Sequence, residues 1–474
     1  MAESKTRAIV KLQVARRLGP RHRWLVGSLV AGGASQLALV IGGVLVARSL
    51  GATDRGYFAL LLIVPHILSE VGNLGLPLAA TYFIAKAPAH ATRIARSLVF
   101  PATVQTLAGV GIQAVALAFL VRDDPARVKV AAAVSLGIIP GLQALQYGLA
   151  VLQGQHRFRP FNVLRVLPSA AYSAGVLAVF VSGYNSLIEI TIVQVTAVVL
   201  VGALTLLIAA RGSAVATPPE EIPWVAVGPD GGALMGAAPP GSPDPCPSRK
   251  KMMRFGAKGL LGSMSAVETF RIDQAVIGLF LTPAALGLYV VGVSITNLPR
   301  FLSQSIGMIA YPIVATTRDL RASYRAVWRY VWISIAISVA VVAPLELLAG
   351  VLIPFFFGSD FAHSTTIARI LLAGTVAVAA RRVLTDGARG AGYPGAGTIA
   401  EVASWVALAP TLVLLVPRFG VEGVAGALAA SWAISLAVLV VIVLRAGIRP
   451  SGRFRGAGNR ERAELPGVNA EGSL

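Results

Sequence analysis

Apolar segments, each close to 20 residues or longer, recur along this chain and are separated by short connections. A helical run of about 20 apolar residues matches the hydrocarbon thickness of a bilayer. Segments of this kind cannot be exposed to water, and the chain has too many of them for one soluble core. The sequence therefore predicts an all-α polytopic membrane protein of about 12 transmembrane helices, near 24–47, 57–84, 97–121, 128–151, 161–181, 187–210, 255–281, 286–313, 330–353, 364–385, 397–416 and 421–444.

The overall composition agrees with a membrane protein. Hydrophobic residues make up 55% of the chain and charged residues only 13%, whereas a soluble domain carries about 25% charged residues. The apolar run 24–47 is too long for the hydrophobic core of a signal peptide, so it is interpreted as a retained first helix.

The 41 Lys and Arg residues are concentrated in every second connection. Cytoplasmic loops of inner-membrane proteins are enriched in these residues. The bias predicts a multi-pass protein of the cell (inner or plasma) membrane with both termini in the cytoplasm. The net charge of +20 then serves orientation and contact with anionic lipid heads, and no nucleic-acid partner is expected. The opposite connections hold only Arg48, Arg55, Arg122, Arg127, Lys129, Arg369 and Arg418.

Changes in composition divide the chain into five parts. The segment 212–252 is rich in Pro and Gly and lacks apolar periodicity, which predicts a flexible cytoplasmic linker between two halves. A short motif near Gly51 returns near Gly287, so the halves are expected to be related by a pseudo-twofold axis along the membrane normal. The predicted parts are a basic cytoplasmic N-terminus (1–23), two six-helix bundles (24–211 and 253–445), the linker between them, and a disordered basic cytoplasmic tail (446–474).

The sequence contains no motif that indicates a bound cofactor or metal. Cys246 is the only cysteine, which excludes an internal disulfide and gives no basis for a zinc site. Gly390–Gly395 fits G-x-G-x-x-G, but it joins two apolar helices instead of a strand and a helix. We therefore expect no bound nucleotide, no metal and no catalytic residues.

Ionisable residues at membrane depth are costly and often functional. Predicted helix 255–281 carries Glu268, Arg271 and Asp273, and the next helix carries Asn297 and Arg300. One interpretation is a cavity surface on which arginines bind a diphosphate, because a guanidinium can donate to two phosphate oxygens at once. The alternative is structural pairing, since Glu268 and Arg271 are three residues apart on a helix.

Two further groups of polar residues are candidates. His66, Glu70 and Asn73 share one face of predicted helix 57–84 and could bind a proton or cation that couples transport to a gradient; the alternative is hydrogen bonding between packed helices. Arg381 and Arg382 lie toward the cytoplasmic end of predicted helix 364–385. They are interpreted as a basic entrance for an anionic head or as side chains that snorkel to the headgroups.

Several short motifs, taken in order, resemble polysaccharide-biosynthesis flippases of the multidrug/oligosaccharidyl-lipid/polysaccharide (MOP) superfamily. The resemblance spans roughly 30–445. It differs from the family in the longer 212–252 segment and in a first helix without charged residues, which carries polar residues such as Ser35 and Gln36 where lipid II flippases carry charges. The motifs are Ala47–Gly51 with Gly56–Tyr57, Gly75–Leu76, Tyr82–Lys86, Arg271–Asp273 with Gly287–Tyr289, Tyr311–Pro312, Phe357–Phe361, Gly390–Pro394 and Phe419–Gly426.

The resemblance implies a flippase that moves an isoprenoid-diphosphate-linked oligosaccharide from the cytoplasmic to the outer leaflet by alternating access. It also singles out Arg48 as a cavity residue, although interfacial anchoring would explain Arg48 equally well. Glycosyltransferases or a polymerase of the same pathway would be partners. A multidrug or cation antiporter of the superfamily is the alternative. A membrane glycan polymerase or ligase, or a scaffold without transport, is disfavoured by the short outer loops.

Overall fold

A computed structural model describes residues 20–211, 226–227, 233–234, 248–263, 271–316, 320–390, 393 and 395–448. Nearly all of these residues are helical, so the predicted all-α fold is confirmed. The first half contains α2 (Pro20–Gly72), α3 (Leu76–Lys86), η1 (Pro88–His90), α4 (Ala91–Leu120), α5 (Ala126–Ser135), α6 (Ile138–Gly154), α7 (Phe158–Ser182) and α8 (Leu187–Ala210). The second half contains α9 (Arg249–Ser263), α10 (Ile272–Phe280), α11 (Pro283–Thr316), α12 (Leu320–Phe357), η2 (Ser359–Phe361), α13 (Ser364–Gly390) and α14 (Gly395–Ile448).

The segment predicted as a linker contains a small hairpin. Strand β1 (Ala226–Val227) pairs antiparallel with β2 (Ala233–Leu234), and α9 begins at Arg249, inside the predicted range 212–252. The rest of that segment up to residue 247 lies outside the described residues, as do most of the predicted N-terminus (1–23) and nearly all of the tail (446–474).

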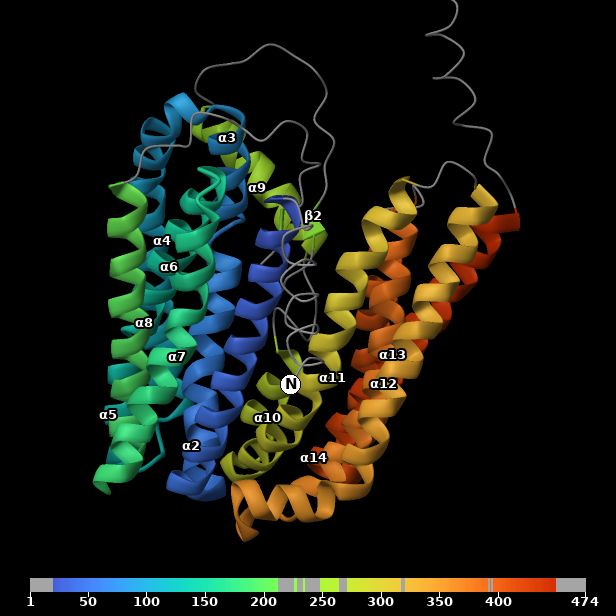
Figure 1. Ribbon diagram of the computed structural model, residues 1–474. Helices are drawn as coiled ribbons and strands as arrows, with labels where there is room; N and C mark the ends of the chain where they lie inside the picture. The colour runs from blue at the N-terminus through green and yellow to red at the C-terminus, as the bar shows by residue number, and fades with distance from the viewer. Residues whose placement is uncertain are drawn as a thin grey trace, which may run out of the picture.

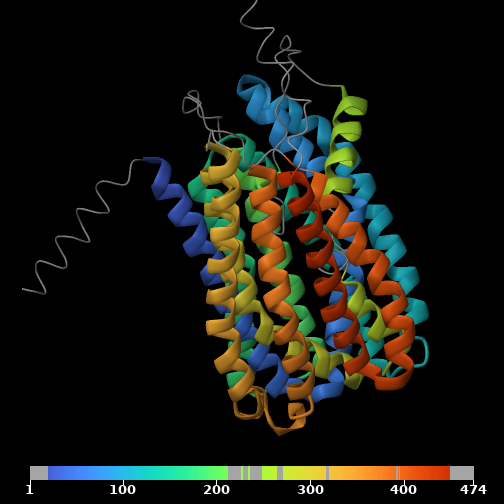
Figure 2. The same ribbon diagram turned by 90° about the vertical axis from the view of Figure 1, so that its right-hand side faces the viewer.

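The helices form two bundles (Figure 1). One contains α2–α8, and the other contains α11–α14, with α10 between them. The bundles converge at the end where α2 turns at Gly51, which we call the Gly51 end, and diverge toward the end that holds Lys86, which we call the Lys86 end. Figure 2 shows α12, α13 and α14 side by side in the second bundle.

Two of the long helices contain a sharp turn at a glycine. Gly51 in α2 has φ 68° and ψ −178°, and Gly420 in α14 has φ 55° and ψ −127°. Both values are accessible mainly to glycine. Each turn falls between two predicted spans, so each helix holds a pair of them. Eight described helices are long and apolar enough to cross a membrane, and the total of 12 crossings stays a prediction.

Two predicted helices are interrupted. The segment 57–84 breaks between α2 and α3, where Leu74 and Gly75 both have positive φ. The segment 255–281 is represented by α9 and α10, and residues 264–270 between them lie outside the described residues. Arg271 begins α10 with φ 45°, a left-handed conformation that is rare for a side chain with a Cβ.

Large apolar side chains on the outside of both bundles are exposed. Phe119 is 74% exposed, Val181 77% and Leu347 80%. Such surfaces are stable only against lipid. The buried apolar residues form clusters within each half, and one further cluster joins Ala47 of α2 to Val291, Ile353 and Phe361 of the second half.

The halves touch most closely where α2 meets α11 at the Gly51 end. A Cβ added at Gly56 would lie 1.7 Å from the carbonyl oxygen of Pro283, and one at Gly287 would lie 2.0 Å from that of Ala52. The two backbones are therefore in direct contact, as is usual for small residues between membrane helices.

We predict that Gly56→Ala forces α2 away from α11 and lowers the free energy of unfolding by about 2 kcal/mol. Gly43→Ala is the matched control, because a Cβ there would meet nothing within 4 Å. Thermal unfolding of the purified variants in detergent measures the difference. Equal midpoints for the two variants would contradict the close backbone contact.

Candidate functional site

Arg271 lies between the two halves. It precedes the first turn of α10, a short helix that contacts α2, α11 and α14. Its side chain is exposed, although the helices around it belong to both bundles. Arg271 therefore places a charged residue where helices of both bundles meet.

Other charged residues gather around Arg271. Its charge acts on Arg55 and His66 of α2 and on Arg300 of α11. The guanidinium of Arg300 lies 5.3 Å from the ring centroid of Trp432 in α14, in cation–π geometry. The fold thus brings the two predicted cavity arginines, Arg271 and Arg300, together.

Asp273 is the carboxylate of this group. It is buried and accepts a hydrogen bond of 2.7 Å from the hydroxyl of Tyr289, which is also buried. The charges of Arg271 and Arg300 both act on it. Asp273 therefore links α10 to α11 and offsets part of the positive charge beside it.

Two other predicted cavity residues are less defined. Asn297 lies on α11, one turn before Arg300, and is half-buried. Glu268 lies outside the described residues, so its predicted pairing with Arg271 stays a prediction.

Arg55 was missed by the sequence reasoning, which assigned it to an outer connection. The structure places it within α2, 9% exposed, with its guanidinium 5.7 Å from the ring centroid of Phe58. Its Nε has no hydrogen-bond partner among the described residues. Only the packing of α2 against its neighbours buries Arg55, and its sequence context, after Asp54, gives no sign of this.

Arg48 joins the two halves at the Gly51 end. Its guanidinium donates to the backbone carbonyls of Phe355 and Phe356 at the end of α12, the latter at 2.7 Å. Carbonyls at a helix C-terminus lack partners within the helix and carry partial negative charge. Arg48 therefore contacts the other half near the membrane surface, whereas Arg271 lies deeper between the bundles.

Two of the three predicted ion-coupling residues, Glu70 and Asn73, belong to a hydrogen-bonded chain that also includes residues of α4 and α6. Gln146 donates to the carboxylate of Glu70 at 2.7 Å, and Asn73 donates to Gln146 at 3.1 Å. Gln105 donates to the backbone carbonyl of Asn73 at 3.4 Å, and Tyr147 donates to Gln105 at 2.6 Å. All four donors point along the chain toward Glu70.

His66 lies one turn before Glu70 and is joined to its own helix. Its Nδ1 is 2.7 Å from the carbonyl oxygen of Leu62. The glutamines of this hydrogen-bonded chain were missed by the sequence reasoning, although Gln105 in the apolar run 97–121 and Gln146 in the run 128–151 are polar residues that could have been recognised. Asn73, in the middle of the hydrogen-bonded chain, also stabilises the break between α2 and α3, because its side-chain oxygen accepts from the backbone N–H of Gly75 at 2.7 Å.

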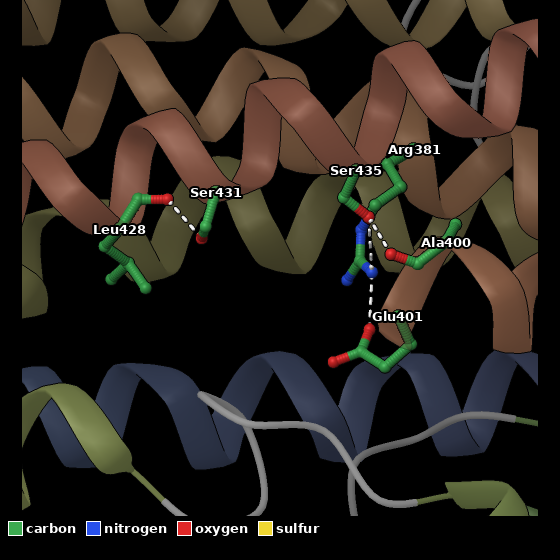
Figure 3. A network of polar contacts seen from close by, with 6 residues as sticks. All are labelled: Arg381, Ala400, Glu401, Leu428, Ser431 and Ser435. Carbon is green, nitrogen blue, oxygen red and sulfur yellow. Dashed lines mark hydrogen bonds and ion pairs between the residues drawn. The ribbon is translucent and has the colours of Figure 1, made fainter. Parts of the chain in front are cut away.

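Arg381 is held inside the second bundle (Figure 3). Its Nη1 donates to Glu401 of α14 at 2.5 Å and to Ser435 at 3.4 Å, and Ser435 donates to the carbonyl of Ala400. Arg382 is half-buried on the same helix. The charge of Arg381 is therefore compensated by Glu401, a partner that the sequence reasoning did not identify.

Comparisons with known proteins agree with this architecture. Residues 244–366 match the family described as polysaccharide biosynthesis protein. No curated protein matches the sequence significantly. Lipid II flippase MurJ in an inward closed conformation aligns with a TM-score of 0.67 at 14% identity, over 88% of this chain and 87% of that one.

Two other solved structures align over most of both chains. An inward-facing multidrug resistance MATE family transporter aligns with a TM-score of 0.63 at 16% identity, over 89% of this chain and 96% of that one. A MOP superfamily transporter from Pyrococcus furiosus, described as having a binding pocket of reverse polarity, aligns with a TM-score of 0.57 at 16% identity over 90% and 95%. Identities this low establish the fold alone. The resemblance predicted from the sequence is thus confirmed: the chain has the fold of the MOP superfamily and, over residues 244–366, the sequence pattern of polysaccharide biosynthesis proteins.

Proposed function

We propose that this protein is a flippase that moves an isoprenoid-diphosphate-linked oligosaccharide from the cytoplasmic to the outer leaflet. The observation that carries the proposal is the group formed by Arg55, Arg271 and Arg300, with Asp273 as the carboxylate beside them. Arg55 and Arg300 each act on Arg271 by like-charge repulsion, and Asp273 is buried beside Arg271 and Arg300. A diphosphate would compensate the positive charge of the arginines with several charge-assisted hydrogen bonds.

The transport route follows from the cost of moving a polar head through lipid. Each unpaired polar group in hydrocarbon costs several kcal/mol or so. The space between the halves offers Arg271, Arg300 and Asn297 as replacement partners, while the isoprenoid tail stays in the bilayer. The bundles converge at the Gly51 end and diverge at the Lys86 end (Figure 1), and with the predicted orientation this is a state open toward the cytoplasm.

The contacts at the Gly51 end form the outer closure in this proposal. Arg48 bonds to the end of α12, and Gly56 packs against Pro283 and Gly287. Alternating access requires these contacts to break when the outer side opens. In this proposal Arg48 helps to hold the outer side closed, and Arg271 and Arg300 bind the polar head of the substrate.

We predict that Arg271→Ala and Arg300→Ala each lower glycolipid flipping by about 10-fold to 100-fold, the loss expected for one hydrogen bond to a charged group. Arg325→Ala is the control, because Arg325 is an exposed residue near the start of α12. The measurement is flipping of a polyprenyl-diphosphate oligosaccharide by purified protein in liposomes, with a cationic dye as a second substrate.

Two results would contradict the proposal. Unchanged flipping in the double variant would remove the arginine group as the binding surface. Transport of the dye without transport of the glycolipid would instead favour a cation antiporter, with Glu70 and Asp273 as the residues to test next.

Glu70 is proposed as the coupling residue, since the hydrogen-bond chain from Tyr147 ends on its carboxylate. Glu70→Gln keeps an acceptor for Gln146 but cannot bind a cation by charge or exchange a proton. We predict that this variant loses the dependence of flipping on a proton or Na⁺ gradient, while Glu422→Gln, at an exposed position, keeps it. Flipping rates with and without each gradient measure this. Full gradient dependence in Glu70→Gln would exclude Glu70 from coupling.

A structural role and an entrance role for Arg381 can be separated. Arg381→Gln removes the ion pair with Glu401 and should cost about 2 kcal/mol of stability. The double variant Arg381→Gln/Glu401→Gln should recover most of that loss, which thermal unfolding measures. If the stable double variant still flips slowly, Arg381 also serves the entrance. If it flips at the normal rate, its role is structural.

A further inference from the structure

A second cationic surface lies on the outside of the first bundle. Arg93, Arg96 and Phe100 are spaced three and four residues apart on α4, so they share one face of the helix. All three are exposed. The same face continues along the membrane span with Val104, 49% exposed, and Leu107, 68% exposed.

Helix α9 brings another guanidinium to this face. Arg249 is exposed, and its guanidinium carbon lies 5.8 Å from the ring centroid of Phe100. The helix is fixed there because Met252 is buried against α3 and Phe255 stacks on Tyr82 with ring centroids 4.4 Å apart. Figure 2 shows α9, in yellow-green, at the upper end of the molecule.

The three arginines concentrate positive charge on this face. Within the part of the chain that the structure describes, none of Arg93, Arg96 and Arg249 forms an ion pair with a carboxylate. Their charges repel one another, and the repulsion favours an anion between α4 and α9. The anion would lie directly above an apolar face that is accessible to lipid chains.

We propose that Arg93, Arg96 and Arg249, with Phe100, form a binding site for the headgroup of an anionic phospholipid. The phosphate of the lipid is held by the guanidinium groups, and its acyl chains lie along Val104 and Leu107. The site faces outward from the first bundle, whereas Arg271 faces the space between the bundles. A resident lipid therefore fits this site better than the transported glycolipid.

Binding at this site would join α9 to α4. Helix α4 precedes the Pro-rich part of the 212–252 segment and α9 begins near its end, and the cation–π contact of Arg249 with Phe100 is a contact between the two helices. A headgroup that bonds to all three arginines adds a second connection. The lipid would thereby stabilise the docking of α9 on the first bundle.

The test uses the purified full-length protein, native mass spectrometry and thermal unfolding. Phosphatidylglycerol should be retained in preference to phosphatidylcholine and should raise the unfolding midpoint. Each cation at a membrane surface contributes about a 5-fold gain in affinity, so Arg93→Gln/Arg96→Gln/Arg249→Gln should weaken phosphatidylglycerol binding by about 100-fold. Arg249→Gln alone should weaken phosphatidylglycerol binding by about 5-fold. This milder variant distinguishes a loss of binding from a general loss of folding.

Arg325→Gln/Arg329→Gln is the matched control. Both residues are exposed and four apart near the start of α12, and Arg329 also lies over an aromatic ring, that of Tyr330. This variant should keep the phosphatidylglycerol preference. The proposal is overturned if the triple variant and the control bind phosphatidylglycerol equally, if phosphatidylcholine binds as well as phosphatidylglycerol, or if a polyprenyl-diphosphate glycolipid displaces the bound lipid from the site.

Discussion

The contact of two backbones at Gly56 and Gly287 sets the geometry on which the other features depend. Because neither residue has a side chain, α2 and α11 approach until each meets the carbonyl oxygen of a residue on the opposite helix. This contact fixes one end of the two bundles and leaves the other end free to diverge (Figure 1). Arg48 then reaches the end of α12 from the first half, and Arg271 and Arg300 meet in the space between the halves.

The cost of charge in a membrane explains the different surroundings of the arginines inside and between the bundles. Arg381 is paired with Glu401 and bonded to Ser435 within one bundle, so its charge is compensated by the protein. Arg271 and Arg300 both act on the buried carboxylate of Asp273, and Arg55 lies close enough to Arg271 for their like charges to repel. Like charges gathered at membrane depth repel one another, and water or a bound anion lowers that cost. This difference distinguishes a structural ion pair from a binding surface.

The sequence predicted the helical class, most of the spans and the meeting of Arg271 with Arg300. Apolar length and cation placement depend only on the bilayer, which acts on every segment alike. The turn at Gly51, the break at Leu74 and Gly75, and the left-handed conformation of Arg271 depend on neighbours that are distant in sequence. For the same reason Arg55 was assigned to a loop, and the partners Glu401, Gln105 and Tyr147 were not identified. Such contacts arise from tertiary packing, which hydropathy does not encode.

Helix α9 follows the Pro-rich segment in sequence but packs on the half that precedes it. Met252 and Phe255 contact α3, and Gly256 contacts Gly75 backbone to backbone. The helices on both sides of the Pro-rich segment, α8 and α9, therefore pack in the same bundle. The length of this segment does not limit how far the two bundles separate. Insertions and deletions in it should therefore leave the relative movement of the bundles unchanged. The chain passes to the other bundle only after α9, and that later passage is where a change of length would alter the relative movement of the two halves.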